Sequence, residues 1–171
     1  SVQLSSELSP FLYPNQFCNF SASSAVVPLA DELTKDAADE LAKVAGVYNW
    51  VVDNISYDTN LAATVSSGYL PDVDSVLAKK KGICFDYAAL MTSMLRAEDV
   101  PTKLVVGYSG SVYHAWISVY TKASGWVDNV IYFDGNAWKL MDPTFASNGK
   151  RSAAIMDYIG NGSNYRTRFS Y

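Results

Sequence analysis

Charge is scarce in this sequence, and the charge that is present is mostly acidic. Charged residues make up 18% of the 171 residues, the net charge is −4 and the isoelectric point is about 4.8. An acidic chain is a poor ligand for phosphate backbones, so nucleic acid is excluded as the main partner. No apolar run approaches the ~20 residues that a membrane helix needs, so we expect no membrane span.

Cysteine and histidine are rarer still. The chain holds two cysteines, Cys18 and Cys84, and one histidine, His114. Two cysteines exclude a disulfide framework and allow one bridge at most, which we do not expect to form. Structural zinc sites take about four ligands from Cys and His, and three such residues make a poor set. We therefore expect neither a bound metal nor a cofactor.

Apolar residues, by contrast, are abundant. They make up 49% of the chain, which is typical of a folded protein rather than a disordered one. The length fits one domain with a substantial core. The low charge, the 12 tyrosines and the many Ser and Asn residues favour an extracellular or cell-surface protein. The sequence as given contains no signal peptide, and its start at Ser1 leaves open that a leader was removed or lies outside the given residues.

The first half of the chain reads as an irregular arm followed by helices. Residues 1–30 lack periodicity and contain three prolines, so we expect an irregular N-terminal arm there and a domain over residues 31–171. Apolar residues at three- and four-residue steps predict one helix over residues 31–55, capped by Asp31 or Thr34. Residues 56–73 read as a loop, after which Asp72 or Asp74 starts a short helix that ends at Lys79–Lys81 before Gly82.

The second half changes from helical to strand periodicity. We predict a helix over residues 84–97, which Pro101 prevents from continuing. Strands follow over residues 102–108, 113–120, 127–133 and 137–141, with a tight hairpin turn at Asp134-Gly135. Helices first and hairpin-linked strands later favour an α+β domain, with helices packed on an antiparallel sheet.

Cys84 directly follows Gly82-Ile83, at the predicted start of a helix. Free backbone N–H groups and the helix dipole favour a thiolate at such a position, and the thiolate is the reactive form. Taken alone, a free cysteine is more often a small buried apolar residue. The placement therefore raises a catalytic hypothesis that needs further residues.

A base and an orienting carboxylate are both available for that hypothesis. His114 lies in an alternating strand and is the one imidazole that could accept the thiol proton. Asp142, in Asp142-Pro143-Thr144, ends a neighbouring strand and could accept the second ring N–H of His114. A half-buried histidine and an ordinary strand-ending turn are the structural alternatives for these two residues.

As an ordered set, these motifs resemble the transglutaminase-like superfamily, which includes papain-related thiol enzymes. The resemblance rests on Gly82-Ile83-Cys84-Phe85-Asp86-Tyr87-Ala88, His114-Ala115-Trp116 and Asp142-Pro143-Thr144. With supporting segments at Trp50–Asp58 and Val100–Tyr108, it spans about Leu41 to Thr144. The resemblance implies a bacterial-type single domain with a papain-like core. In this core the helix bearing the cysteine packs against an antiparallel sheet that bears His and Asp.

The resemblance also implies a chemistry. Cys84 would be the nucleophile, His114 the general base and acid, and Asp142 the orienting carboxylate of a triad. Cys84 would attack a carboxamide or peptide carbonyl to form a thioester, which water or an amine such as lysine would resolve. The first outcome is a peptidase or amidase and the second is a transglutaminase. The sequence leaves the two open.

The remaining site residues are less determined by the sequence. The backbone N–H of Cys84 is the natural first oxyanion donor, and Tyr57 and Asn54 are candidates for a second. Tyr57 could equally be a core residue with a satisfied hydroxyl. Trp116 either walls the cleft or packs on the sheet.

Two functions therefore follow from the sequence. The first is an extracellular or surface thiol enzyme that acts on protein or peptide substrates, cell-wall peptide among them. The second is a non-catalytic binding or scaffold module with a vestigial triad, because fold and site together do not prove turnover. Thiol reactivity of Cys84 would discriminate between them.

Overall fold

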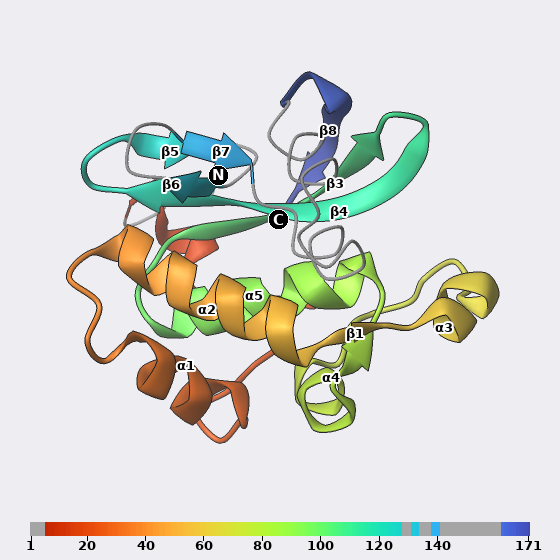
Figure 1. Ribbon diagram of the computed structural model, residues 1–171, viewed down its shortest axis with the longest axis horizontal. Helices are drawn as coiled ribbons and strands as arrows, with labels where there is room; N and C mark the ends of the chain where they lie inside the picture. The colour runs from red at the N-terminus through yellow and green to blue at the C-terminus, as the bar shows by residue number, and fades with distance from the viewer. Residues whose placement is uncertain (1–5, 128–130, 134–137, 141–161) are drawn as a thin grey trace.

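Helices cover one face of an antiparallel sheet in this computed structural model (Figure 1). The structure describes residues 6–127, 131–133, 138–140 and 162–171. Helix on sheet is a stable two-layer arrangement, because each element has one apolar face to bury. The predicted α+β class is confirmed. Within the described residues, no helix has the length and apolar character needed to cross a membrane.

The helices and short elements come first in the chain. They are η1 (Ser9–Phe11), α1 (Val26–Thr34), α2 (Glu40–Asn54), β1 (Ser56–Tyr57), α3 (Thr59–Thr64), α4 (Val73–Lys79), β2 (Lys81–Gly82) and α5 (Cys84–Ala97). The strands follow: β3 (Thr102–Ser109), β4 (Val112–Thr121), β5 (Gly125–Val127), β6 (Ile131–Phe133), β7 (Trp138–Leu140) and, after η2 (Gly162–Asn164), β8 (Tyr165–Ser170).

The main sheet has the strand order β5-β4-β3-β8, and every neighbouring pair is antiparallel. The long β3–β4 hairpin places Gly107 opposite His114 and Val105 opposite Trp116. β4 is buried from His114 to Val119, so both of its faces are covered rather than one. A strand covered on both faces holds its side chains in a fixed direction, which suits a strand that carries a functional residue.

The predicted helix over residues 84–97 is confirmed as α5, and it is the central element of the helical layer. It packs against α1, α2 and α4 and against strands β3 and β4. All of its residues from Asp86 to Arg96 are buried, including the apolar side chains of Met91, Met94 and Leu95. A helix that is buried on every side is held rigidly, so the residue at its start has a well-defined position.

The single helix predicted over residues 31–55 is wrong, because the structure has two helices there. α1 begins at Val26 and ends at Thr34, and α2 begins after Asp39, whose carboxylate accepts a 2.8 Å hydrogen bond from the Ala42 N–H. The two helices pack side by side. A Cβ on Gly46 would lie 2.7 Å from the Leu33 carbonyl oxygen, so only glycine allows this close approach.

Two segments that read as irregular also contain helices. α1 begins inside the predicted arm, and the predicted boundary at residue 30 lies within this helix. Pro28 is tolerated there because the first-turn N–H groups of a helix have no intrahelical partner. The predicted loop over residues 56–73 contains β1 and the short α3, whose N-cap is Asp58. Asp72 caps α4, as one of the two predicted alternatives had it.

The later strands differ from the prediction in their pairing. The predicted strand over residues 127–133 is two strands, since β5 pairs with β4 whereas β6 pairs with β7. The predicted turn at Asp134-Gly135 lies outside the described residues. The C-terminal stretch, which carries no clear periodicity, forms β8 at the edge of the main sheet beside β3.

Candidate active site

Cys84 is the first residue of α5, and its side chain is half-buried. Ile83 precedes it in an extended conformation, and the Ile83 N–H donates a 2.8 Å hydrogen bond to the carboxylate of Asp86. That bond satisfies one of the donors at the start of the helix and fixes the angle at which the chain enters it. The first turn of α5 therefore holds Cys84 at the N-terminal, electropositive end of a buried helix.

Asp86 is itself anchored on its second oxygen. Its side chain is 0% exposed and accepts a 2.7 Å hydrogen bond from the Tyr69 hydroxyl. Burial raises the pKa of the Asp86 carboxyl, and the hydrogen bonds from Ile83 and Tyr69 oppose that rise. Asp86 therefore bonds to backbone and supports the local fold.

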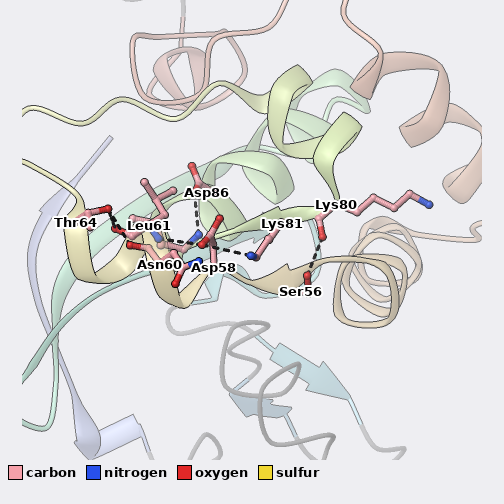
Figure 2. Close-up of polar contacts among 9 residues, drawn as sticks. Ser56, Asp58, Asn60, Leu61, Thr64, Lys80, Lys81 and Asp86 are labelled. Atoms are coloured by element: carbon pink, nitrogen blue, oxygen red, sulfur yellow. Dashed lines mark hydrogen bonds and ion pairs between the residues drawn. The ribbon is translucent and has the colours of Figure 1, made fainter.

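A short parallel strand pair brings Tyr57 beside the cysteine segment. In β1 and β2, Tyr57 lies opposite Gly82, and the Asp58 N–H donates to the Gly82 carbonyl at 2.9 Å. The Ser56 N–H donates to the Lys80 carbonyl at 3.0 Å. Figure 2 shows Asp58 between the N-terminus of α3 and Lys81, which lies 3.6 Å away, with Asp86 nearby.

The Tyr57 phenol lies in a setting that keeps it protonated. Burial raises its pKa most, and the negative charges of Cys84 and Asp86 raise it further. The phenol has no hydrogen-bond partner within the described part of the chain, although the side chain is half-buried. A protonated phenol near a cysteine thiolate can donate a hydrogen bond to an oxyanion formed there.

His114 lies near the start of β4 and is 4% exposed. Its ring is stacked 6.3 Å from the ring of Trp116, and Tyr165 of β8 lies 6.5 Å from it. A ring packed this closely has little rotational freedom, so the strand and its neighbours set the direction of the imidazole.

One cavity of about 620 Å³ joins these elements. Both Cys84 and His114 line it, and Tyr57 does too. The volume is in the range of small-molecule and peptide sites. The other described lining residues are Phe17, Ala62, Val65, Ser66, Ser67, Gly68, Tyr69, Leu70, Ile83, Phe85, Val106, Val112, Tyr113, Ala115 and Tyr171.

Two predicted residues are not placed at this cavity by the described structure. Asp142 lies outside the described residues, so its contact with His114 stays a prediction. Trp116 is 2% exposed and packs edge-on against Tyr165, with ring centroids 5.2 Å apart. It is absent from the described lining of the cavity. A role for Trp116 in substrate binding also stays a prediction.

Among the cavity residues that the sequence did not indicate, three aromatic ones lie in segments with no predicted helix or strand. Tyr69 lies in a segment read as loop, Phe17 lies in the arm, and Tyr171 lies in the unassigned tail. None of the three belongs to a motif or to a periodic pattern. Their common signal is aromatic character in otherwise irregular sequence, which alone predicts nothing about position.

The described residues contain no cluster of side chains suited to binding a metal ion. No group of three or more His, Cys, Asp or Glu side chains there could hold a metal ion. Both cysteines are free, with Cys18 buried and Cys84 half-buried. The expectation that Cys18 and Cys84 do not pair is thus confirmed.

Solved structures share this fold. A candidate cysteine protease from Cytophaga hutchinsonii superposes with a TM-score of 0.59 at 20% identity, over 98% of this chain and 55% of that one. The periplasmic domain of TgpA from Pseudomonas aeruginosa gives a TM-score of 0.57 at 23% identity, over 83% of this chain and 49% of that one. At such identities the likeness shows the fold, and the predicted papain-like, transglutaminase-like core is confirmed.

Curated relatives are similar in sequence over part of their length. The kyphoscoliosis peptidases of mouse and human are 27% identical over 139 residues, which is 74% of this chain and 19% of each relative. The protein-glutamine gamma-glutamyltransferase of Pseudomonas aeruginosa is 28% identical over 114 residues, or 58% of this chain and 17% of that protein. The chain thus spans about a fifth of the length of the curated relatives it matches.

The family itself is shown by a match to most of the chain. The sequence model of the transglutaminase-like superfamily matches residues 27–143. This range begins in α1 and includes Cys84, His114 and Asp142. The chain therefore belongs to the transglutaminase-like superfamily.

Proposed function

We propose that this chain is a cysteine acyl-transfer domain in which Cys84 is the nucleophile, His114 the base and Asp142 the orienting carboxylate. One observation carries the proposal: a cysteine at the start of the buried helix α5 and a buried histidine on β4 line the same cavity. Nucleophile and base thus come from separate rigid elements that face a common space, as covalent catalysis requires. The match of the family model across all three residues supports the third member.

The first half-reaction forms a thioester. His114 accepts the thiol proton as the Cys84 sulfur attacks the carbonyl carbon of a carboxamide or peptide bond. The carbonyl oxygen becomes an oxyanion, for which the Cys84 backbone N–H and the Tyr57 hydroxyl are the donors we propose. The C–N bond then breaks, and the leaving nitrogen departs as ammonia or an amine with the proton from His114.

The second half-reaction releases the acyl group. Water or a primary amine attacks the thioester carbon, and His114 takes a proton from the attacking atom. The C–S bond breaks and the thiolate regains its proton from His114. With water the product is an acid, and with lysine it is an amide cross-link. Among the relatives, one is named as a peptidase and another as a glutamyltransferase, so both acceptors belong in the test.

Substrates and location are part of the same proposal. We propose protein or peptide substrates, because a cavity of about 620 Å³ suits a side chain with its flanking backbone. We propose an extracellular or cell-surface location, which the low charge and tyrosine-rich composition support. The TgpA relative is a periplasmic domain, which is consistent with that location.

The first test is the rate of Cys84 alkylation by iodoacetamide as a function of pH, read by mass spectrometry. We expect rapid modification of the folded wild type near neutral pH. His114→Ala should slow it by about tenfold or more, because the thiol loses its base. Because His114 is buried, His114→Asn keeps most of the volume and guards against misfolding. Ser111→Ala, in the exposed β3–β4 turn, is the control.

Turnover is the second test. Ammonia release and amine incorporation from glutamine peptides, with and without a lysine analogue, should fall by about 10³-fold or more in Cys84→Ala. A Cys84 that stays inert in the folded wild type at every pH would contradict the proposal. That result would support the binding-module alternative instead.

A further inference from the structure

Three aromatic rings from distant parts of the chain form one wall of the cavity. Phe17 comes from the N-terminal arm, Phe85 from the first turn of α5, and Tyr171 from the end of the chain. The ring of Phe17 lies 4.2 Å from that of Tyr171 and 5.9 Å from that of Phe85. All three are half-buried, so their contact also leaves apolar surface facing the cavity. Phe85 is the immediate neighbour of Cys84.

The arm is held in place by a buried cation. Arg96 is 2% exposed, and its guanidinium donates to the carbonyl of Tyr13 at 2.6 Å and to the sulfur of Cys18 at 3.2 Å. It also donates to the carbonyl of Tyr171 at 2.8 Å and twice to that of Thr102. A planar guanidinium with this many acceptors fixes their relative positions. Arg96 thereby ties the arm and the chain end to one point on α5.

The arm also has its own local order beside Phe17. The side-chain oxygen of Asn15 accepts from the N–H groups of Phe17 and Cys18, at 2.9 and 3.2 Å. Cys18, the next residue, is 0% exposed. The backbone of Phe17 is thus held between an Asx turn and a buried side chain, which fixes the position from which its ring reaches the cavity.

The chemistry of the lining selects against charge. Within the described residues, no Asp, Glu, Lys or Arg side chain lines the cavity. Moving a charged group from water to such a surface costs free energy that no partner restores, whereas burying an apolar side chain is favourable. The polar groups that do line it are hydroxyls, the thiol and the imidazole, and these suit an amide.

We infer that Phe17, Phe85 and Tyr171 form an apolar subsite that binds a large apolar side chain of the acyl-donor peptide beside Cys84. The arm is then part of the substrate site, and Phe17 determines specificity without touching the reacting atoms. This inference rests on the proposed function, since it assigns the substrate class of the same site. The donor is a peptide whose residue next to the reactive carbonyl is aromatic or large aliphatic.

Matched electrophiles test the subsite without requiring turnover. The chloromethyl ketones of acetyl-phenylalanine and acetyl-aspartate carry the tested residue beside the ketone carbonyl, alkylate a thiol by the same chloride displacement and differ in one side chain. Each rate at Cys84 is divided by that of chloroacetamide with the same variant, which removes differences in thiol reactivity. We expect the wild type to prefer the phenylalanine reagent by about tenfold. Phe17→Ala should lose most of that preference.

Two further variants control for folding and for position. Phe17→Leu keeps an apolar side chain and should retain most of the preference, even if Phe17→Ala perturbs the arm. Tyr13→Ala removes an aromatic ring from the same arm, but that ring is 66% exposed and outside the cavity. It should keep the wild-type preference. Equal normalised rates for the two reagents in the wild type, or an unchanged preference in Phe17→Ala, would overturn the inference.

The design separates this inference from the proposed function. If Cys84 reacts with chloroacetamide but the preference is absent, the subsite is wrong and the nucleophile stands. If Cys84 is inert to all reagents, the proposed function fails. Binding of acetyl-phenylalanine amide and acetyl-aspartate amide to Cys84→Ala, followed by NMR, then decides the subsite. Preferential binding of the phenylalanine amide supports it, and equal or absent binding overturns it.

Discussion

The hydroxyl of Tyr69 donates a 2.7 Å hydrogen bond to the buried carboxylate of Asp86, two residues after Cys84. This bond ties a wall of the cavity to the first turn of α5, because Tyr69 lines the cavity and Asp86 bonds to the Ile83 N–H. The site therefore depends on a buried carboxylate that we do not assign to the chemistry.

Tyr69→Phe should lower the free energy of unfolding by about 1–2 kcal/mol, because Asp86, in a buried site, loses one of the two hydrogen-bond donors that the described residues give it. Urea unfolding followed by tryptophan fluorescence measures the change. Tyr13→Phe is the matched control, since Tyr13 is 66% exposed. Equal effects of the two substitutions would show that the Tyr69 bond does not stabilise the fold.

Gly82→Ala should destabilise the protein by about 1–3 kcal/mol through overpacking. An alanine Cβ at this position would lie 2.6 Å from the Asp86 Cβ and 2.9 Å from its Oδ2, and Asp86 is fixed by its hydrogen bonds. Thermal unfolding and Cys84 alkylation should both change. Lys81→Ala, the exposed neighbour in β2, should cost less than about 1 kcal/mol. A Gly82→Ala variant as stable as the wild type would mean that the helix start can shift.

The two cysteines should differ in reactivity. Cys18 is 0% exposed, and burial raises the pKa of its thiol more than the nearby Arg96 guanidinium lowers it. Cys84 is half-buried and lines the cavity. Iodoacetamide should therefore modify Cys84 alone in the folded protein and both residues in urea, as peptide mass spectrometry can show. Rapid labelling of Cys18 in the folded protein would mean that the arm detaches from Arg96.

Asp58 should contribute a stability that depends on pH. The hydrogen bond from the Leu61 N–H, with the charge of Lys81 nearby, holds the pKa of Asp58 below its ordinary value of 3.8. A lowered folded-state pKa stabilises the protein above the ordinary value, and that contribution is lost as the pH falls through the lowered one. Asp58→Asn should therefore be less stable than the wild type at about pH 7, with the difference shrinking at about pH 2.5.

Urea unfolding at several pH values measures that difference. The asparagine keeps a side-chain oxygen that can cap α3, so the substitution removes the charge and leaves the cap. A stability difference that stays constant from neutral to acidic pH would contradict the assignment of the effect to ionisation of Asp58. Asp53→Asn, on α2, is the control carboxylate.

The sequence predicted best where signals are local. α5 has the predicted bounds, because Gly82 and Pro101 flank a segment that contains neither glycine nor proline. The break between α1 and α2 was missed although Asp39 is a good N-cap, because the apolar period continues across it. The spacing of apolar residues shows which residues face a core. It does not show where one helix ends and the next begins when both helices pack against the same core.

The candidate site likewise contains residues that sequence motifs predict and residues that they do not. The family motifs around Cys84 and His114 could be found in the sequence, and the fold brings both to one cavity. Phe17 and Tyr171 could not be found, because their positions follow from a buried Arg96 that donates to the backbone carbonyls of Tyr13, in the arm, and of Tyr171. Nothing in the residues around Arg96 shows that an arginine near the end of a helix will be buried.

The sequence alone thus determined the fold class, the helix that starts at Cys84 and the strand that carries His114. These follow from short-range terms, namely side-chain period, capping and turn chemistry, which neighbouring residues decide. Only the tertiary structure decided that an arm and a chain end meet at the cavity and that Asp86 is buried beneath it. Those positions depend on contacts between residues far apart in sequence, where burial and hydrogen bonding outweigh local preference.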